Sequence, residues 1–215
     1  MMPNPLNDNY LMSLKEQPFN SVKASAKYKD LDFYLVFITR ECIQNDHIIH
    51  LLSKWRKENE FWFPAIFPVS DERTKIWLEE RVINVKERLL FLIEIENEYI
   101  GHVGLWHFDY EKMACDIDNL IRGVSKYPGI IDNVMELLHS WARSELGIRD
   151  FYLQTLLENI SAMRLYTRLG YEVIKTEPLI QKEVDGRLEW VPAPEGYMGE
   201  SERTDARMHL KRKPE

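Results

Sequence analysis

The sequence has little cysteine, no long apolar run and no excess of positive charge. Its two cysteines, Cys42 and Cys115, lie far apart and form no CxxC motif, so the sequence shows neither a disulfide framework nor a cysteine zinc site. Its longest apolar runs, 33–38 and 89–93, are far shorter than the ~20 residues of a membrane helix. We therefore expect a cytoplasmic protein without a membrane partner.

The charge balance is acidic. Lys and Arg number 28 against 35 Asp and Glu, which gives a formal net charge of -7 and disfavours broad attraction to nucleic acids or anionic lipids. Acidic residues lie among the basic ones near the end of the chain, between 200 and 213, which is typical of a solvated chain end. We expect no nucleic-acid partner.

The rest of the composition is that of a globular protein. With 215 residues, of which 45% are hydrophobic and 29% charged, the chain is long enough for one domain with a buried core. Residues 1–31 contain no apolar block of signal-peptide length, so we expect a loose polar arm there and a domain over 32–215. Proline, glycine and glutamate concentrate between 192 and 203, which predicts an exposed flap.

Hydrophobic periodicity and turn residues predict a mixture of strands and helices. Gly101 and Gly104 indicate close backbone approach or a bulge, and Asp185-Gly186 indicates a tight hairpin turn. Helices are expected to begin at 45–46 and 70–71, to run from 130 to a stop at Gly147, and to span 159–169. Strands are expected at 33–39, 89–95, 99–108, 113–121, 151–157, 171–176, 179–184, 187–191 and 208–211.

One fourteen-residue segment carries most of the functional information. Residues 158–171 read ENISAMRLYTRLGY, and two helical turns bring Asn159 and Tyr166 onto one face. Taken alone, Asn159 could merely cap a helix and Tyr166 could merely pack. The whole segment resembles the N-x-x-A-x-x-L-Y-x-x-x-G-F signature of the GNAT superfamily of N-acetyltransferases, with Tyr171 where Phe is usual. The order of elements is also similar to that family, in the branch of ribosomal-protein N-terminal acetyltransferases and small-molecule relatives.

The resemblance implies a fold and a co-substrate. The fold would be α+β, with a mixed, mostly antiparallel central sheet and helices on both faces. The co-substrate would be acetyl-CoA, with Asn159 bonding the pantetheine chain and the Tyr166 hydroxyl reaching the thioester sulfur. The backbone of Leu120 and Ile121 would also bond pantetheine, and a strand N–H there could polarise the thioester carbonyl.

The expected phosphate loop departs from the family pattern. A glycine-containing loop that enters a helix offers N–H donors and a positive dipole end to an anion. The family's R/Q-x-x-G-x-G/A motif reads KYPGII over 126–131. Pro128 lacks an N–H and Ile131 replaces a small residue, so an ordinary Pro-Gly helix start is the alternative. The candidate cofactor-binding residues here are Lys126, Tyr127, Gly129, Ile130 and Ile131.

Direct transfer to an amine needs a proton acceptor, a stabilised oxyanion and a proton for the leaving thiolate. Asp116 stands where many relatives have Glu, and strand alternation puts Asp118 on the same face; both are candidate bases. An Asp carboxyl has a reference pKa of ~3.9, so burial or a water relay would have to assist it, and a solvent-facing acid is the alternative reading. Tyr166 is the candidate donor to the sulfur.

The histidines suggest no metal site. His102 and His107 have opposite parities on one strand, so they cannot easily share a ligand. His47 and His50 are helical neighbours without an evident third ligand. We expect no metal.

We expect an acetyltransferase for a small-molecule primary amine, with an amino sugar as the favoured class. Trp190 and Tyr197, at the flap, are the candidate substrate-binding rings. A protein N-terminal amine and a non-catalytic acyl-CoA sensor are the alternatives, and a homodimer is left open.

Overall fold

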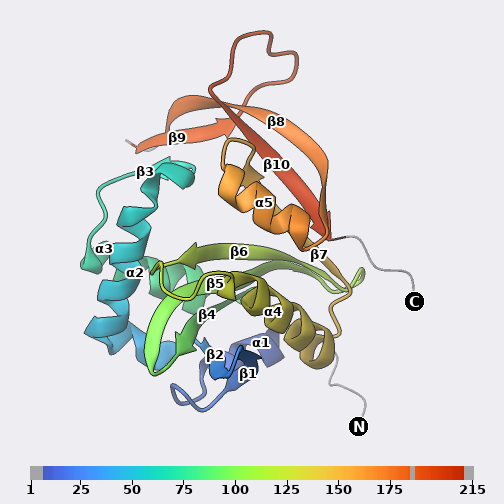
Figure 1. Ribbon diagram of the computed structural model, residues 1–215. Helices are drawn as coiled ribbons and strands as arrows, with labels where there is room; N and C mark the ends of the chain where they lie inside the picture. Colours follow the sequence, from blue (N-terminus) through green and yellow to red (C-terminus); the bar gives the residue numbers. More distant parts are fainter. Residues whose placement is uncertain (1–6, 185–186, 211–215) are drawn as a thin grey trace. The chain divides into compact units, whose positions relative to one another are not determined.

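The computed structural model describes residues 7–184 and 187–210 (Figure 1). The chain divides into two compact units. Among the described residues, the first unit comprises 7–57 and 69–151, and the second comprises 58–68 and 152–210. No helix in these described ranges is long and apolar enough to cross a membrane.

Within residues 7–31 the amino-terminal segment contains a helix and a strand, which corrects the expectation of a loose arm for this part of 1–31. Its described part contains helix α1 (Asp8–Lys15) and strand β1 (Lys23–Tyr28). Asn7 caps α1 by accepting a hydrogen bond from the Tyr10 N–H, 3.0 Å away, and Leu11 and Leu14 are buried. Two leucines spaced three apart are a weak local signal, because a short helix gains most of its stability from packing.

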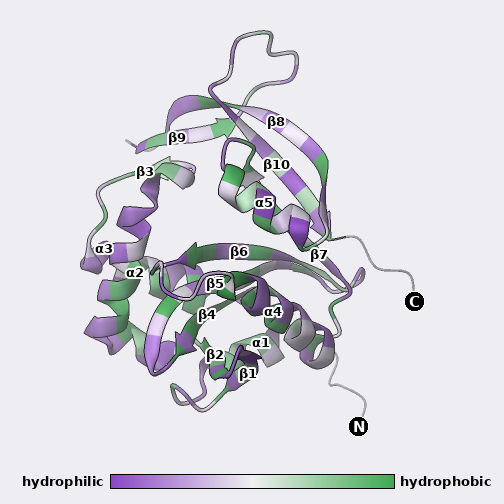
Figure 2. Ribbon diagram, in the orientation of Figure 1, coloured by the Kyte–Doolittle hydropathy of each residue, from purple (hydrophilic) through white to green (hydrophobic). Residues whose placement is uncertain are grey.

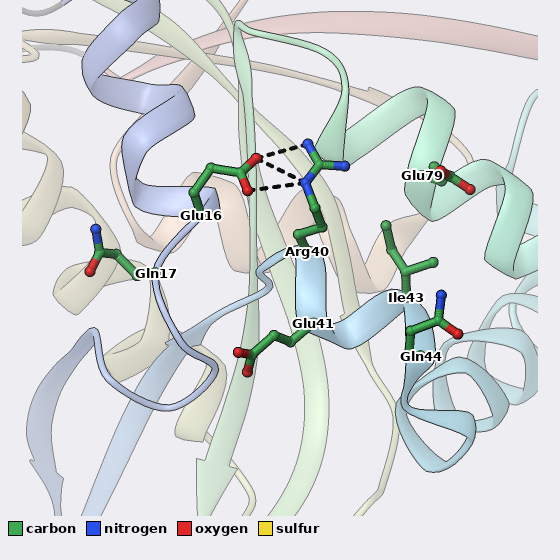
Figure 3. Close-up of a pocket in the computed structure, with 7 residues that line it drawn as sticks. All are labelled: Glu16, Gln17, Arg40, Glu41, Ile43, Gln44 and Glu79. Carbon is green, nitrogen blue, oxygen red and sulfur yellow. Dashed lines mark hydrogen bonds and ion pairs between the residues drawn. The ribbon is translucent and has the colours of Figure 1, made fainter.

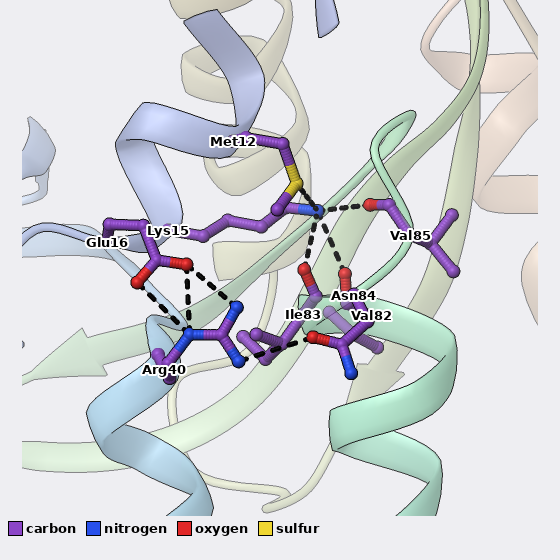
Figure 4. Close-up of polar contacts among 8 residues, drawn as sticks. All are labelled: Met12, Lys15, Glu16, Arg40, Val82, Ile83, Asn84 and Val85. Atoms are coloured by element: carbon purple, nitrogen blue, oxygen red, sulfur yellow. Dashed lines mark hydrogen bonds and ion pairs between the residues drawn. The ribbon is translucent and has the colours of Figure 1, made fainter. Parts of the chain in front are cut away.

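Lys15 anchors α1 to a distant segment (Figure 4). Its buried ammonium donates to the carbonyl oxygens of Val82, at 2.9 Å, and of Ile83 and Val85. The first two belong to η3 (Glu79–Ile83), a π-helical turn that continues α3 (Asp71–Leu78). Carbonyl groups at a helix end lack intrahelical partners and attract a cation, so Lys15 satisfies them.

The first unit is built on a five-stranded sheet. Its strand order is β1-β2-β4-β5-β6, and every described pairing is antiparallel. Glu96 and Asn97 both have positive φ, as a two-residue hairpin turn requires. The strands are β2 (Leu31–Phe37), β4 (Arg88–Ile95), β5 (Glu98–Asp109) and β6 (Ala114–Arg122).

Helices cover both faces of this sheet. Trp141 of α4 (Ile130–Leu146) packs against Phe37 and Phe91. Trp55 of α2 (Asp46–Glu58) contacts His102. His102 pairs with Leu92, which directly follows Phe91 in β4, so Trp55 lies on the opposite face of the sheet. Figure 2 shows hydrophobic residues gathered along β4 and β5. The expected α+β fold with helices on both faces is therefore confirmed in this unit.

The second unit holds the other strands. Their order is β7-β10-β8-β9-β3, again with antiparallel pairings. Leu156, Leu179 and Trp190 form a buried cluster in it. Its elements are β3 (Ala65–Ile66), β7 (Asp150–Leu156), α5 (Ile160–Arg168), β8 (Tyr171–Val184), β9 (Arg187–Pro192), β10 (Arg203–Leu210) and the short 3-10 turn η2 (Glu60–Trp62). A second 3-10 turn, η1 (Arg40–Gln44), belongs to the first unit.

Two expected boundaries were wrong in this unit. The strands expected at 171–176 and 179–184 are one strand, β8, which continues through Pro178. The last strand begins at Arg203 rather than 208, because its early residues pair with β8 from Leu179 onward. The loop at 193–202 matches most of the expected flap, while the Asp185-Gly186 turn and Lys211 lie outside the described residues.

Candidate active site

The acidic side chains of β6 lie on one sheet face, as alternation predicts. The register pairs Asp116 with Trp106 and Asp118 with Gly104. Gly104 is required for the close approach of the strands, because a Cβ there would lie 2.7 Å from the carbonyl oxygen of Leu89. Both carboxylates are largely buried, so neither is a simple solvent-facing acid at a strand end.

Asp118 forms an ion pair with Arg88. Its Oδ2 accepts hydrogen bonds from Arg88 Nε at 2.8 Å and from Asn119 Nδ2 at 2.8 Å. The Arg88 guanidinium also lies over the rings of Trp106, at 4.3 Å, and Trp77, at 5.8 Å. A carboxylate that neutralises a nearly buried guanidinium loses stabilising contacts if it takes a proton. Asp118 is therefore the weaker candidate base.

Asp116 has a partner that the sequence analysis missed. Its Oδ2 lies 3.1 Å from Nδ1 of His107, and the His107 ring stacks on Trp106 with centroids 3.9 Å apart. The His107 side chain is 57% exposed while that of Asp116 is 13% exposed. An imidazole that donates from Nδ1 to a carboxylate presents Nε2 as a proton acceptor. The pair can therefore take a proton from an approaching group.

Local backbone geometry produces this contact. His107 has a φ of 49°, and the β5–β6 register shifts between Trp106 and Asp109. Such a bulge redirects a side chain that simple alternation would send to the other face. The sequence analysis considered His107 only as a metal ligand. The one feature of the sequence that could have indicated this contact was an acidic residue, Asp116, on the neighbouring strand of the expected β5–β6 hairpin.

The other histidines have structural surroundings. His102 is buried against Trp55, and burial lowers its pKa to about 4. It is therefore neutral at physiological pH. His50 Nδ1 lies 3.1 Å from Asp71 Oδ2 at the surface. Within 7–184 and 187–210, no group of three His, Cys, Asp or Glu side chains could hold a metal ion.

The backbone of β6 is irregular where the expected pantetheine contacts lie. Asn119 has a φ of 47°, directly before Leu120 and Ile121. Ile121 is buried and pairs with His102. Gly101 is also required here, because a Cβ would lie 2.2 Å from the Ile121 carbonyl oxygen. Leu120 and Ile121 therefore follow a local kink in the strand.

The expected phosphate loop ends at Gly129, the N-cap of α4. Gly129 has a φ of 87°, and a Cβ placed there would meet no atom within 4 Å. Ile130 and Ile131 are both buried, and Ile131 belongs to the same helix stripe as Val134, Met135 and Leu138. Ile131 therefore faces the hydrophobic core, not the space around the loop.

Contacts with the β4–β5 turn brace this loop. Lys126 forms ion pairs with Glu98, at 3.3 Å, and Glu96, at 3.7 Å. The Tyr127 hydroxyl donates to Glu96, and the Tyr28 hydroxyl donates to the carbonyl oxygen of Pro128 at 2.7 Å. An anion at this helix end would meet the Lys126 ammonium and the positive end of the helix dipole. Two N–H groups of the first turn, those of Ile130 and Asp132, already donate to the carbonyl oxygens of Tyr127 and Gly129.

In the second unit, Asn159 and Tyr166 lie at the start and near the end of α5. Asn159 caps the helix, since its Oδ1 accepts from the Ala162 N–H at 3.1 Å. In the described part of the chain its Nδ2 has no partner. Tyr166 is buried edge-on against Tyr171, and burial raises its pKa above the ordinary value. Its hydroxyl therefore stays protonated and can donate.

The two candidate substrate rings differ in position. Trp190 lies in the buried cluster of the second unit and does not present an open ring. Tyr197 lies in the 193–202 loop, where its hydroxyl donates to the Glu200 carbonyl oxygen at 3.1 Å. The ring of Tyr197 also covers Gly199. It therefore holds its own loop together.

A surface pocket of about 410 Å³ in the first unit contains none of these residues (Figure 3). Arg40 crosses it, and its Nη2 and Nε donate to Glu16 at 2.8 and 2.9 Å. Asn84 also accepts from Arg40, at 3.2 Å. The pocket lies beside the α1 anchor. Its lining residues are Glu16, Gln17, Arg40, Glu41, Ile43, Gln44 and Glu79.

Comparisons with known proteins agree on one family. A family model for an acetyltransferase (GNAT) domain matches residues 40–172. Mutant forms of the spermidine/spermine N-acetyltransferase SpeG from Vibrio cholerae are similar in structure, with 16% identity, a TM-score of 0.56, and coverage of 83% of this chain and 92% of that one. RimL, a ribosomal L7/L12 alpha-N-protein acetyltransferase, is also similar in structure, with 14% identity, a TM-score of 0.58, and coverage of 90% of this chain and 98% of that one.

A probable GNAT-family acetyltransferase from Chromobacterium violaceum is also similar, with 14% identity, a TM-score of 0.63, and coverage of 91% of this chain and 87% of that one. At these identities the structural likenesses establish the fold. A comparison with curated protein sequences gives no significant match.

Proposed function

Because this chain belongs to the GNAT family of acetyltransferases, we propose that it transfers the acetyl group of acetyl-CoA directly to a primary amine of a small molecule. The observation that carries the proposal is the contact between His107 and Asp116, with 3.1 Å between Nδ1 and Oδ2. It supplies an exposed proton acceptor beside an aromatic ring, on a sheet face that also carries Asp118.

The reaction moves one proton off the amine and one onto sulfur. The amine nitrogen bonds to the thioester carbonyl carbon, the carbon–sulfur bond breaks, and the sulfur leaves as a thiol. His107 Nε2 takes the amine proton, while Asp116 holds Nδ1 and stabilises the imidazolium that forms. The Tyr166 hydroxyl donates its hydrogen toward the sulfur, a role suited to a buried phenol that stays protonated.

The chain has groups that suit the parts of acetyl-CoA, which supplies the acetyl group as an activated thioester. The open side of Gly129 and the N-terminus of α4 suit the phosphates, and Lys126 adds a positive charge. The backbone of Leu120 and Ile121 and the amide of Asn159 are the proposed pantetheine contacts. The burial of Ile131 supports this assignment, because the side chain does not face the loop.

The surroundings of the proposed base favour an acetyl-accepting substrate that is a protonated amine before it reacts. Asp116 contributes negative charge beside the exposed ring of His107. Carboxylates attract ammonium groups, and a base then generates the neutral nucleophile. We propose a small primary amine, with amino sugars as the first class to test. The titles of the similar structures name a polyamine and a ribosomal protein as acceptors, so both belong in the same test.

The decisive experiment follows thiol release from acetyl-CoA in the presence of amines. The panel contains amino sugars, nucleotide-linked amino sugars, spermidine and peptides with free N-termini, and mass spectrometry locates the added acetyl group. Acetylation of one small-molecule class, lost in the His107→Gln variant, supports the proposal. Acetylation of peptides alone would establish the protein N-terminal alternative, and binding of acetyl-CoA without turnover across the panel would favour a sensor.

A further inference from the structure

Two buried hydrogen-bond donors in the second unit lack partners. They are Nη1 of Arg203 and Nε1 of Trp190, and neither has an acceptor within the described ranges. Arg203 is 7% exposed and Trp190 is 8% exposed. Buried donors are almost always paired, because an unmet donor keeps its desolvation cost. We propose that these two groups form a binding site for an oxyanion, either a phosphate ester or a carboxylate.

The two side chains that carry these donors contact each other. The Arg203 guanidinium carbon lies 4.7 Å from the centroid of the Trp190 ring and 4.4 Å from that of Phe61. The guanidinium thus contacts two aromatic rings. Across the part of the chain that the structure describes, it has no carboxylate within ion-pair distance. A buried cation without a counterion is unusual in a folded protein.

The strand register holds this arrangement in place. Arg203 opens β10 opposite Leu179 of β8, and Leu179 pairs on its other side with Pro192 of β9. Trp190 lies two residues before Pro192 and therefore shares its sheet face. The Ser201 hydroxyl accepts from the Leu179 N–H at 3.1 Å, which fixes the backbone just before Arg203. The donors are therefore preorganised by backbone pairing.

The donor set selects the ligand chemistry. A guanidinium and an indole N–H donate hydrogen bonds and accept none. The site is therefore built for an acceptor, and the positive charge of Arg203 selects a negative one. Guanidinium geometry matches the paired oxygens of a carboxylate or phosphate. Metal cations and amines are excluded as occupants.

Phe61 provides a movable cover for the site. Its side chain lies on the guanidinium but is 62% exposed, so it loses little buried surface when it swings aside. Trp62 packs edge-on against Phe61, with centroids 4.8 Å apart, and is also exposed. The rings beside the anion site would contact an apolar or planar part of an organic anion. These side chains take no part in the proposed proton transfers or CoA contacts, so binding of an anion here can be tested independently of acetyl transfer.

Nuclear magnetic resonance of the full chain tests the proposal without an activity assay. The indole N–H signal of Trp190 is assigned among the six tryptophans with Trp190→Phe. Inorganic phosphate, acetate and chloride are then titrated separately at constant ionic strength. We expect the chemical shift of the Trp190 indole N–H to change and then reach a plateau as phosphate or acetate is added. The anion with the lower dissociation constant identifies whether the natural oxyanion is a phosphate ester or a carboxylate. Chloride should change this chemical shift far less.

Variants separate the site from general salt effects. Arg203→Gln should weaken the response at least tenfold, whereas Arg203→Lys, which keeps the positive charge, should retain part of it. Arg187→Gln, an exposed arginine in β9, is the matched control and should titrate like the wild-type chain. A Trp190 signal that does not respond to 50 mM phosphate or acetate would overturn the proposal. An equal response to chloride, or in a folded Arg203→Gln chain, would also overturn it.

Discussion

The imidazole of His107 and the carboxylate of Asp116 face each other across the β5–β6 ladder, with 3.1 Å between Nδ1 and Oδ2. The carboxylate is mostly buried and the imidazole mostly exposed. In such a pair the imidazole acts as the base and the carboxylate orients it. One residue meets the substrate and the other fixes the ring that meets it.

Replacing either member should slow the chemical step. We expect His107→Gln to lower kcat by about 100-fold, the lower end of what general base catalysis contributes, with little change in the KM for acetyl-CoA. Asp116→Asn should also lower kcat, because the amide stabilises the imidazolium less well. Added imidazole should partly restore a His107→Ala chain, which a purely structural role would not allow.

The control for this pair is His50→Gln. His50 makes a similar contact with Asp71, at 3.1 Å, but lies at the surface on α2. Its replacement should leave kcat unchanged. Steady-state kinetics with the acceptor found in the panel measures all four variants, and an unchanged kcat in His107→Gln would remove His107 from the mechanism.

Tyr166→Phe tests the proposed donor to the sulfur. The Tyr166 hydroxyl has no hydrogen-bond partner among residues 7–184 and 187–210, so its removal should cost little stability. We expect kcat to fall by about 100-fold while the dissociation constant of acetyl-CoA changes little. Tyr197→Phe serves as the control, because that hydroxyl only holds its own loop. Equal rates in the two variants would contradict the assignment.

Local patterns were sufficient to predict part of the fold and part of the site. Helix α4 and the β4–β5 hairpin follow from residues close together in the chain, including Gly147 at the helix end and the turn at 96–97. The shared face of Asp116 and Asp118 follows from strand alternation. These features need no information about distant contacts.

Other features depend on contacts between distant residues. The ion pair of Arg88 with Asp118 joins β4 to β6 across β5, and Lys15 reaches carbonyl groups near residue 83. The turn of His107 toward Asp116 depends on a bulge that alternation does not foresee. These contacts could not be predicted from spacing, because strand register and loop closure decide them.

The position of Ile131 leads to a prediction about stability. Because its side chain is buried on the core stripe of α4, Ile131→Ala should lower the free energy of unfolding by ~2–5 kcal/mol. Affinity for CoA should stay within about threefold. Chemical denaturation and calorimetry measure the two quantities. Ile174→Ala, at an exposed position of β8, should change neither. A tenfold gain in CoA affinity with Ile131→Ala would show that the side chain obstructs the phosphates.

Gly129 offers a test with a closely matched control. Gly129 and Gly196 both have positive φ, at 87° and 78°, and a Cβ at either would meet no atom within 4 Å. Alanine at each position should therefore cost a similar ~1–2 kcal/mol of stability through backbone strain. Only Gly129→Ala should weaken CoA binding, because its new methyl group enters the proposed phosphate space. Equal CoA affinities in the two variants would place the phosphates elsewhere.

The buried ammonium of Lys15 should make stability depend on pH. Burial lowers its pKa from 10.5 to about 8, so between these pH values the unfolded chain binds more protons than the folded chain. The free energy of unfolding should therefore rise with pH from about 8 to 10.5, by up to ~3 kcal/mol from this group. Below pH 8 the contribution is constant. Urea denaturation at a series of pH values measures the slope, and the difference between the wild-type chain and Lys15→Met isolates Lys15 from other titrating groups. A Lys15→Met chain that keeps the wild-type slope would show that the ammonium titrates normally within its carbonyl contacts.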